Sequence, residues 1–316
     1  MSKKIFLSGV KPTGRPHIGN YFGAMKQFVE LQDKYESYIF IADLHALTGI
    51  QKKEELEENT ANVLLDYMAI GLDPKKVTIF KQSDVPQVTE LAWIFNCLTT
   101  MPYLMRAHAF KDAEAKNKEI NVGVFDYPLL MAADILIQDA DVVPVGADQK
   151  QHVEIARDTA QKFNNTFGET FKLPEPMILE NVATVPGTDG RKMSKSYGNT
   201  IPLFATDEEI EKVAMGIVTD SGADIPENVF AIHSLIRSKD ELGNIYNENK
   251  GQYQKIKEIL VADMKAFIAP MRDKRQALSE DKSAVLEVLK AGGKVARERA
   301  EKKMEEVREK VGLKLY

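Results

Sequence analysis

Apolar residues along the chain, up to about residue 190, alternate between two kinds of spacing. Short continuous apolar runs are typical of strands buried on both faces, and apolar residues three or four positions apart are typical of helices. The runs predict strands over 3–10, 37–47, 76–83 and 141–146, and the helical spacing predicts helices over 20–35, 54–71, 92–98 and 147–163. Strands of this kind that alternate with helices indicate a parallel sheet covered on both faces. We therefore expect a doubly wound, Rossmann-like α/β domain.

The pattern changes after residue 204, where strand signals stop and every apolar stretch has helical spacing. A chain of 316 residues is long for a single hydrophobic core. We therefore predict two domains, an α/β domain over 1–204 and an all-helical domain over 205–316. Within the second, the charges of 297–310 are mixed in sign and spaced four apart, which indicates a solvated helix face rather than a nucleic-acid tract.

Composition narrows the class of protein. The hydrophobic fraction of 44% and the charged fraction of 28% are ordinary for a soluble globular protein. No apolar run reaches membrane-spanning length and no signal-peptide pattern opens the chain, so we expect a cytoplasmic protein with no membrane partner. A net charge of −5 disfavours general nucleic-acid binding and a DNA partner, but it leaves room for a local basic path for RNA. The lone cysteine, Cys97, excludes an internal disulfide, and its apolar neighbours predict a buried structural thiol.

Two stretches carry candidate chemistry. "GVKPTGRPHIGNY" (9–21) follows the first predicted strand, where glycines let backbone approach a ligand and a helix N-terminus offers N–H groups to phosphate. Its spacing is neither the dinucleotide fingerprint nor a P-loop, so an ordinary turn is an equally good interpretation of this stretch alone. "GTDGRKMSKSYGNT" (187–200) places Arg191, Lys192 and Lys195 between glycines, and cations on such a flexible loop can follow the charge of a departing polyphosphate. An exposed basic turn would have the same composition. Together the two stretches favour a nucleotide site.

The segments "HIGN" (17–20) and "KMSKS" (192–196) resemble the signature pair of the class I aminoacyl-tRNA synthetases. "IADLHALT", "FDYPLLMAADILI" and "VPVGADQKQH" occur in the order found in the tryptophan-specific branch of that family. The resemblance implies a ligase that joins L-tryptophan to ATP, giving tryptophanyl-AMP and pyrophosphate, and then transfers the tryptophanyl group to its tRNA. It also implies Mg²⁺ bound with the ATP phosphates and no fixed protein metal site, anticodon binding by the helical domain, and a homodimer.

The resemblance assigns roles to individual residues. Catalysis, as electrostatic stabilisation of the transition state, is expected from His17, Asn20, Lys192 and Lys195. ATP contacts are expected from Lys11, Pro12, Thr13, Gly19, Asn20, Gly146, Ala147, Asp148, Lys192, Met193, Ser194, Lys195 and Ser196. Tryptophan contacts are expected from Leu7, Asp43, His45, Tyr127, Met131, Asp134, Val143, Val145 and Gln149.

Among these residues, Asp134 carries the amino-acid specificity. It lies inside an otherwise apolar predicted helix, and a buried carboxylate requires a hydrogen-bond donor. A helix cap or an ion pair with a neighbouring helix would satisfy it. The resemblance instead favours the indole N–H of tryptophan as the donor.

Three other functions remain open at this stage. Tyrosyl specificity is the alternative within the same class, and tryptophan- against tyrosine-dependent pyrophosphate exchange distinguishes the two. A small-molecule adenylyltransferase shares a histidine-glycine turn on a similar sheet. Charging of purified tRNA distinguishes the two, because only a synthetase transfers an amino acid to tRNA. An inactive paralogue that senses tryptophan or RNA would give no pyrophosphate exchange at all.

Overall fold

The computed structural model describes residues 3–115, 120–146, 150–178, 185–219 and 225–315. It divides into two compact units. The α/β unit comprises Met1–Gly14, Glu30–Leu179 and Lys282–Tyr316, and the helical unit comprises Arg15–Val29 and Glu180–Asp281. None of the helices in the described part of the chain combines the length and apolar character needed to cross a membrane.

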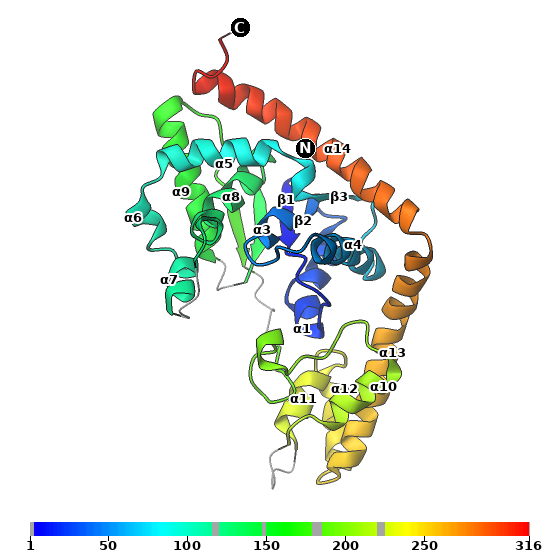
Figure 1. Cartoon of the computed structure of the whole chain (residues 1–316). Coiled ribbons are helices and arrows are strands. Elements are labelled where there is room, and N and C mark those ends of the chain that lie inside the picture. The colour runs from blue at the N-terminus through cyan, green and yellow to red at the C-terminus, as the bar shows by residue number, and fades with distance from the viewer. Residues whose placement is uncertain (1–2, 116–119, 147–149, 179–184, 220–224, 316) are drawn as a thin grey trace. The chain divides into compact units, whose positions relative to one another are not determined.

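A five-stranded parallel sheet forms the centre of the α/β unit (Figure 1). Its strands are β1 (Ile5–Val10), β2 (Glu36–Ile41), β3 (Val77–Lys81), β4 (Val142–Val145) and β5 (Glu175–Ile178), in the order β3-β2-β1-β4-β5. The order reverses direction at β1, so β1 and β4 flank the switch point where doubly wound sheets bind ligands beyond the carboxyl ends of the strands. The predicted α/β fold is confirmed.

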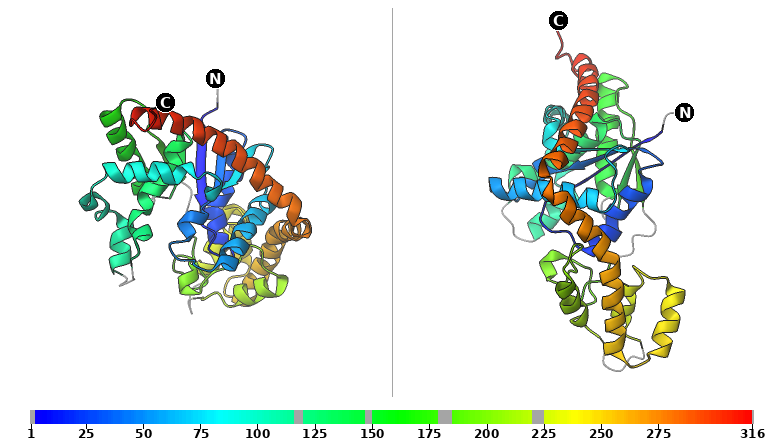
Figure 2. Two further views of the ribbon diagram at one scale, coloured as in Figure 1. Left: turned by 45° about the horizontal axis from the view of Figure 1, so that its top comes forward. Right: turned by 90° about the vertical axis from the view of Figure 1, so that its right-hand side faces the viewer.

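Helices cover this sheet (Figure 2). In chain order they are α3 (Asp43–Ala46), α4 (Lys53–Ala69), the 3₁₀ turn η2 (Gln82–Asp84), α5 (Gln87–Leu98), α6 (Met101–Leu104), α7 (His108–Ala115), α8 (Val122–Ile137), α9 (Lys150–Phe167) and α14 (Lys282–Lys310). One hydrophobic core joins the sheet to α5, α8, α9 and α14 through fully buried side chains such as Leu7, Phe95, Leu129, Phe163 and Met304. This core fixes the positions of the strand ends that carry the candidate site.

The last helix, α14, packs against β3 of the α/β unit although it ends the chain (Figure 1). Two adjacent glycines make that approach possible. A Cβ on Gly292 would lie 1.9 Å from the backbone oxygen of Ile79, and one on Gly293 would lie 2.9 Å from Asp84. Any larger residue would push the helix off the strand.

The helical unit has its own core. It contains α1 (Ile18–Asn20), the π-helix η1 (Tyr21–Met25), the start of α2 (Lys26–Leu31), the 3₁₀ turn η4 (Lys195–Tyr197), α10 (Asp207–Met215), α11 (Glu227–His233), α12 (Lys239–Glu248) and α13 (Tyr253–Glu280). Apolar residues of α13 such as Ile256, Leu260 and Ile268 are buried and pack with α10 and α11. The sequence pattern correctly predicts helices here.

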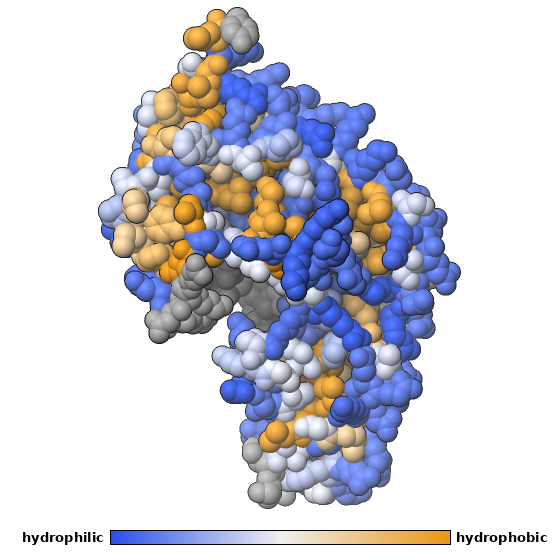
Figure 3. Space-filling model, in the orientation of Figure 1, coloured by the Kyte–Doolittle hydropathy of each residue, from blue (hydrophilic) through white to orange (hydrophobic). Residues whose placement is uncertain are grey.

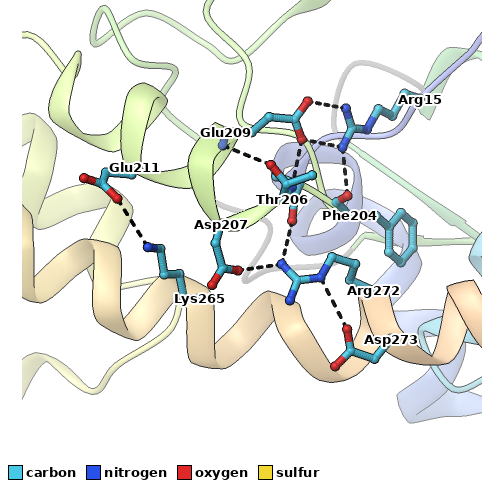
Figure 4. A network of polar contacts seen from close by, with 10 residues as sticks. Arg15, Phe204, Thr206, Asp207, Glu209, Glu211, Lys265, Arg272 and Asp273 are labelled. Carbon is cyan, nitrogen blue, oxygen red and sulfur yellow. Dashed lines mark hydrogen bonds and ion pairs between the residues drawn. The ribbon is translucent and has the colours of Figure 1, made fainter.

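Ion pairs tie the first residues of this unit to α10 (Figure 4). Both terminal nitrogens of Arg15 donate to the carboxylate of Glu209 at 2.8 Å, and one of them also donates to the carbonyl of Phe204. Arg272 of α13 donates to Asp207 at 2.6 Å. These contacts secure the chain directly ahead of the "HIGN" segment.

Four local expectations differ from the structure. The strand predicted over 37–47 ends at Ile41, because Asp43 turns the chain into α3 by accepting the N–H of Leu44. Strand β5 has no counterpart in the sequence pattern, because this short edge strand, with the sequence EPMI, lacks a continuous apolar run. The helix predicted over 20–35 begins at Ile18 and includes a π-helical stretch. Cys97 is exposed rather than buried, because it follows Trp93 by four residues on the outer face of α5.

The two compact units do not coincide with the predicted functional domains, which divide between residues 204 and 205. The helical unit also includes Arg15–Val29 and begins its second segment at Glu180, whereas Lys282–Tyr316 belongs to the α/β unit. Assignment of anticodon binding to 205–316 stays a prediction.

Candidate active site

A buried carboxylate lies at the centre of the α/β unit. Asp134 on α8 is 4% exposed. The side-chain amide nitrogen of Gln82 donates to both of its carboxylate oxygens at 2.9 Å, and Nε2 of His45 lies 3.0 Å from Oδ2. Because the carboxylate accepts, Nε2 of His45 carries the proton. The predicted need of Asp134 for a donor is thus met in part by two residues that follow β2 and β3.

The carboxylate of Asp134 has one acceptor position that the described contacts do not occupy. Burial raises the pKa of its carboxyl, and the hydrogen bonds from His45 and Gln82 act in the opposite direction. A carboxylate offers about four acceptor positions, and the described contacts occupy three of them. An N–H from a bound ligand would complete the set and favour the ionised form.

The turn η2 connects this carboxylate to the end of β2. Gln82 accepts the backbone N–H of His45 at 3.2 Å. The next residue, Ser83, donates through both its N–H and its hydroxyl to the carboxylate of Asp43, the N–H at 2.9 Å. Asp43 therefore holds the turn that presents Gln82 to Asp134.

Gln82 and Ser83 are the residues that the sequence analysis missed. The available signal was their position directly after the buried strand β3, at the same sheet edge as Asp43 and His45 after β2. Neither residue belongs to a motif of the family resemblance, and an amide or hydroxyl shows its role only through its partners.

Aromatic rings extend the cluster. Tyr127 of α8 lies with its ring centroid 6.0 Å from that of His45 and 5.4 Å from that of His152. Its hydroxyl is 3.3 Å from Nε2 of His152. The ammonium of Lys11 lies 5.3 Å from the centroid of the Tyr127 ring, and burial lowers the pKa of Lys11. The end of β1 therefore brings a cation to the same ring.

The other sequence-predicted residues of this unit fall into three groups. Buried side chains of the sheet core are Leu7, Val143 and Val145, and Met131 packs against that core. Residues that follow β1 and β4 are Pro12, which is buried, Thr13, whose N–H donates to the carbonyl of Lys11, and Gly146. Residues outside the described part of the chain are Ala147, Asp148 and Gln149.

The second cluster lies in the helical unit, where the "HIGN" and "KMSKS" segments are neighbours. The N–H of Ile18 donates to the carbonyl of Ile201 at 2.9 Å, and the N–H of Leu203 donates to the carbonyl of Pro16 at 3.0 Å. His17 pairs with Pro202 in an antiparallel bridge. Backbone pairing thus holds the start of the "HIGN" segment against residues 201–203, which follow the "KMSKS" segment by a few positions.

Gly19 allows the side chains of the two motifs to meet. A Cβ at this position would lie 2.8 Å from Nδ1 of His17 and 3.3 Å from the sulfur of Met193. Met193 is buried, whereas Lys192 and Lys195 on either side of it are exposed. Ser194 and Ser196 exchange a hydrogen bond between their hydroxyls at 2.9 Å. The motif is therefore anchored by its methionine and presents its lysines outward.

The polar groups of "HIGN" are poised for a ligand. His17 is 8% exposed, and burial, followed by the charge of Lys195, lowers its pKa to about 4. Its ring is therefore neutral near pH 7, and its Nδ1 has no partner in the described part of the chain. Asn20 accepts the backbone N–H of His17 through Oδ1 at 3.0 Å. Its NH₂ group has no partner among the described residues, so it can donate to an acceptor such as a phosphate oxygen.

Within the described ranges, no three His, Cys, Asp or Glu side chains are grouped as a metal site requires. The lysines and the neutral histidine of the motif cluster are suited to an anion. The carboxylate cluster is suited to a ligand with an N–H donor and a flat apolar body.

Comparison with known proteins places this geometry in a family. Residues 2–269 match the model for tRNA synthetases class I (W and Y). The tryptophan–tRNA ligase of Fusobacterium nucleatum is 49% identical over 97% of both chains, and that of Rhodopirellula baltica is 46% identical over 98% of this chain and 99% of its own. A crystal structure of tryptophanyl-tRNA synthetase from Campylobacter jejuni, complexed with ADP and tryptophan, superposes with a TM-score of 0.91 at 43% identity over 98% of this chain and 99% of that one.

Proposed function

The chain belongs to the class I tRNA synthetases for tryptophan and tyrosine, and we propose that its two side-chain clusters divide the recognition of amino acid and phosphate. It is a tryptophan–tRNA ligase. Such an enzyme activates L-tryptophan with ATP to tryptophanyl-AMP and pyrophosphate, and then transfers the tryptophanyl group to tRNA. The buried Asp134, oriented by Gln82 and His45, is the observation that carries the proposal.

Recognition of tryptophan is proposed for the α/β cluster. The indole N–H donates to the acceptor position of Asp134 that the described contacts leave over. Tyr127 and Met131 supply a flat, polarisable wall for the ring, with Leu7, Val143 and Val145 in the sheet behind them. Asp43 is proposed to act by holding η2 in place, since its oxygens accept from Ser83.

Activation is proposed to depend on the motif cluster. The tryptophan carboxylate attacks the α-phosphorus of ATP, a new C–O–P bond forms, and the bond to the β-phosphate oxygen breaks to release pyrophosphate. His17 and Asn20 donate hydrogen bonds to the phosphates as negative charge shifts between them. Lys192 and Lys195 stabilise the charge that develops on the pyrophosphate. His17 acts while neutral, because its pKa of about 4 keeps it uncharged near pH 7.

The remaining ATP contacts stay proposals from the family resemblance. They are Lys11, Pro12, Thr13, Gly19, Gly146, Ala147, Asp148, Met193, Ser194 and Ser196. Mg²⁺ is proposed to arrive bound to the ATP phosphates, and the cationic lining of the motif cluster fits a metal held by substrate rather than by protein ligands.

The enzyme is also proposed to work in the cytoplasm as a homodimer. A groove of about 600 Å³ on the α/β unit is lined in part by Leu44, Leu47, Ala92, Trp93 and Val122, and the side chains of Leu47, Trp93 and Val122 are exposed there. Trp93 is 70% exposed. Apolar surface is visible over this part of the unit in Figure 3. Large exposed apolar side chains gathered at one groove are a common mark of a protein–protein contact.

Pyrophosphate exchange with single amino acids tests the proposed function. Exchange should depend on tryptophan and be negligible with tyrosine, and purified tRNA should then accept the tryptophanyl group. Exchange with tyrosine at an equal rate would overturn the role of Asp134, and exchange without tRNA charging would favour a small-molecule adenylyltransferase.

A further inference from the structure

One buried amide organises the whole "KMSKS" segment. Asn199 is 2% exposed. Its Oδ1 accepts the N–H of Ser194 at 2.8 Å, and its Nδ2 donates to the carbonyl of Lys192 at 3.2 Å. Its own backbone carbonyl accepts the N–H of Thr188 at 3.0 Å. The single side chain therefore contacts the backbone on both sides of Met193.

Nδ2 of Asn199 has a second acceptor in Asp189, 2.6 Å from Oδ1 of that carboxylate. The hydrogen bond from Asn199 is the main reason that the pKa of Asp189 lies below its ordinary value. Asp189 also accepts from the N–H of Arg191 at 3.1 Å and from its guanidinium Nε at 2.7 Å. The pair of residues 189 and 199 thus closes the segment at its two ends.

The backbone is shaped to admit this amide. A Cβ on Gly187 would lie 2.2 Å from Nδ2 and 2.8 Å from the backbone oxygen of Asn199. No residue other than glycine fits position 187 while Asn199 is in place. Two independent features, the hydrogen bonds and the missing side chain, therefore converge on the same buried group.

We propose that Asn199, held by Asp189, is a positioning residue for pyrophosphate release: it fixes the backbone of Lys192 and Ser194 so that the ammonium groups of Lys192 and Lys195 meet the departing phosphates. This inference rests on the proposed function of the two lysines. Charge stabilisation in a transition state requires groups that are oriented before the reaction, and a displacement of about 1 Å costs roughly a hundredfold in rate. Long lysine side chains on an unfixed loop would lack that orientation.

The test alters the hydrogen bond between Asn199 and Asp189, first by removing its donor and then by reversing donor and acceptor. Asn199→Asp keeps the acceptor for Ser194 but places a carboxylate against Asp189, so kcat of tryptophan-dependent pyrophosphate exchange should fall at least 30-fold, as roughly expected for a misplaced charge cluster. The KM for tryptophan should stay within about twofold, because Asp134 is untouched. Adding Asp189→Asn removes the repulsion between the two carboxylates and restores a hydrogen bond between these side chains with donor and acceptor reversed. The carbonyl of Lys192 still lacks its donor, so the double variant should recover part of the lost kcat but not all of it.

A matched control separates positioning from general stability. Asn249 is another buried asparagine of the helical unit, and its Nδ2 donates to the carbonyl of Ile245 at 2.7 Å. Asn249→Asp should lower the thermal midpoint while leaving kcat within about twofold. An Asn199→Asp variant that loses stability but keeps kcat would overturn the inference, and so would a double variant with no recovery.

A second control separates this inference from the proposed function. Lys195→Ala should lower kcat of exchange strongly if the lysine stabilises pyrophosphate. Full activity of Lys195→Ala would overturn the proposed role of the lysine itself. Loss of activity in Lys195→Ala with full activity in Asn199→Asp would overturn only the positioning role.

Discussion

Asp134 is the residue on which amino-acid selection depends in our proposal. Asn at this position would direct an NH₂ group toward donors on His45 or Gln82, so both the internal and the substrate hydrogen bonds would suffer. A hydrogen bond to a charged group contributes about 1.5–3 kcal/mol. We expect Asp134→Asn to lower kcat/KM for tryptophan in pyrophosphate exchange by roughly ten- to a hundredfold.

The matched control for Asp134 is another acidic residue of the same unit. Asp158 accepts a hydrogen bond from the hydroxyl of Tyr103 and belongs to neither cluster. Asp158→Asn should leave kcat/KM for tryptophan within about twofold. Equal activity of the two variants would remove Asp134 from its proposed role.

His17 makes a second prediction at the residue scale, this time for stability. Its pKa is about 4 in the folded protein and about 6.5 when unfolded, so between these values the unfolded chain binds more protons. Folding stability should therefore rise with pH from about 4 to 6.5 and be fully present above that range. The gain in stability across this pH range is at most about 3.4 kcal/mol.

Replacement of His17 by glutamine checks this contribution, because glutamine does not titrate. The midpoint of urea unfolding, measured from pH 4.5 to 7, should rise less steeply in His17→Gln than in the parent protein. The same slope in both proteins would contradict the lowered pKa of His17.

At the scale of elements, α14 depends on the absence of side chains where it crosses β3. Gly292→Ala would place a Cβ 1.9 Å from the backbone oxygen of Ile79, which no side-chain rotation can relieve. We expect a loss of stability above about 3 kcal/mol, as for severe overpacking, or a protein that does not fold. Thermal and denaturant unfolding measure the effect.

Gly243 on α12 provides the comparison for this substitution. A Cβ there meets no atom within 4 Å, so Gly243→Ala should be neutral or stabilising by up to about 1 kcal/mol. A Gly292→Ala variant as stable as Gly243→Ala would show that α14 is free to move away from the strand.

At the scale of the whole molecule, the sequence predicts that a parallel sheet is covered by helices, but not which helices pack against that sheet. Alternating apolar runs are sufficient for the parallel sheet, because buried strands differ sharply from amphipathic helices. The same periodicity identifies α14 as a helix but does not reveal which core it joins, since that depends on the close approach at Gly292. Strand β5 is not predicted from the sequence, because this short edge strand with Pro176 lacks the continuous apolar run of a central strand.

The residues of the candidate site also fall into those that the sequence indicates and those that only the structure reveals. Charged and motif residues such as Asp134 and Lys195 are found from sequence because burial or clustering of charge is unusual. Gln82 and Asn199 are not, because an amide shows its role only through its partners. The partners of Gln82 lie 37 and 52 residues away in the sequence. Those of Asn199 lie within 10 residues, but only the folded loop shows that its side chain turns back onto them.

The proposed homodimer yields the prediction that belongs to the whole molecule. Trp93 is 70% exposed on α5, and Leu47 and Val122 are exposed beside the same groove. A charge placed in the apolar centre of an interface would lose its hydration without a partner, which costs several kcal/mol. Trp93→Glu should therefore convert the dimer to a monomer in sedimentation equilibrium.

Leu315 is the control for that charge, because it is 87% exposed near the end of the chain and outside the groove. Leu315→Glu should sediment as the parent protein does. If Trp93→Glu also sediments as a dimer, the association uses another surface and the groove has a different partner. If the parent protein is itself monomeric, the exposed apolar face has no second copy to cover it, and the proposed homodimer fails as a whole.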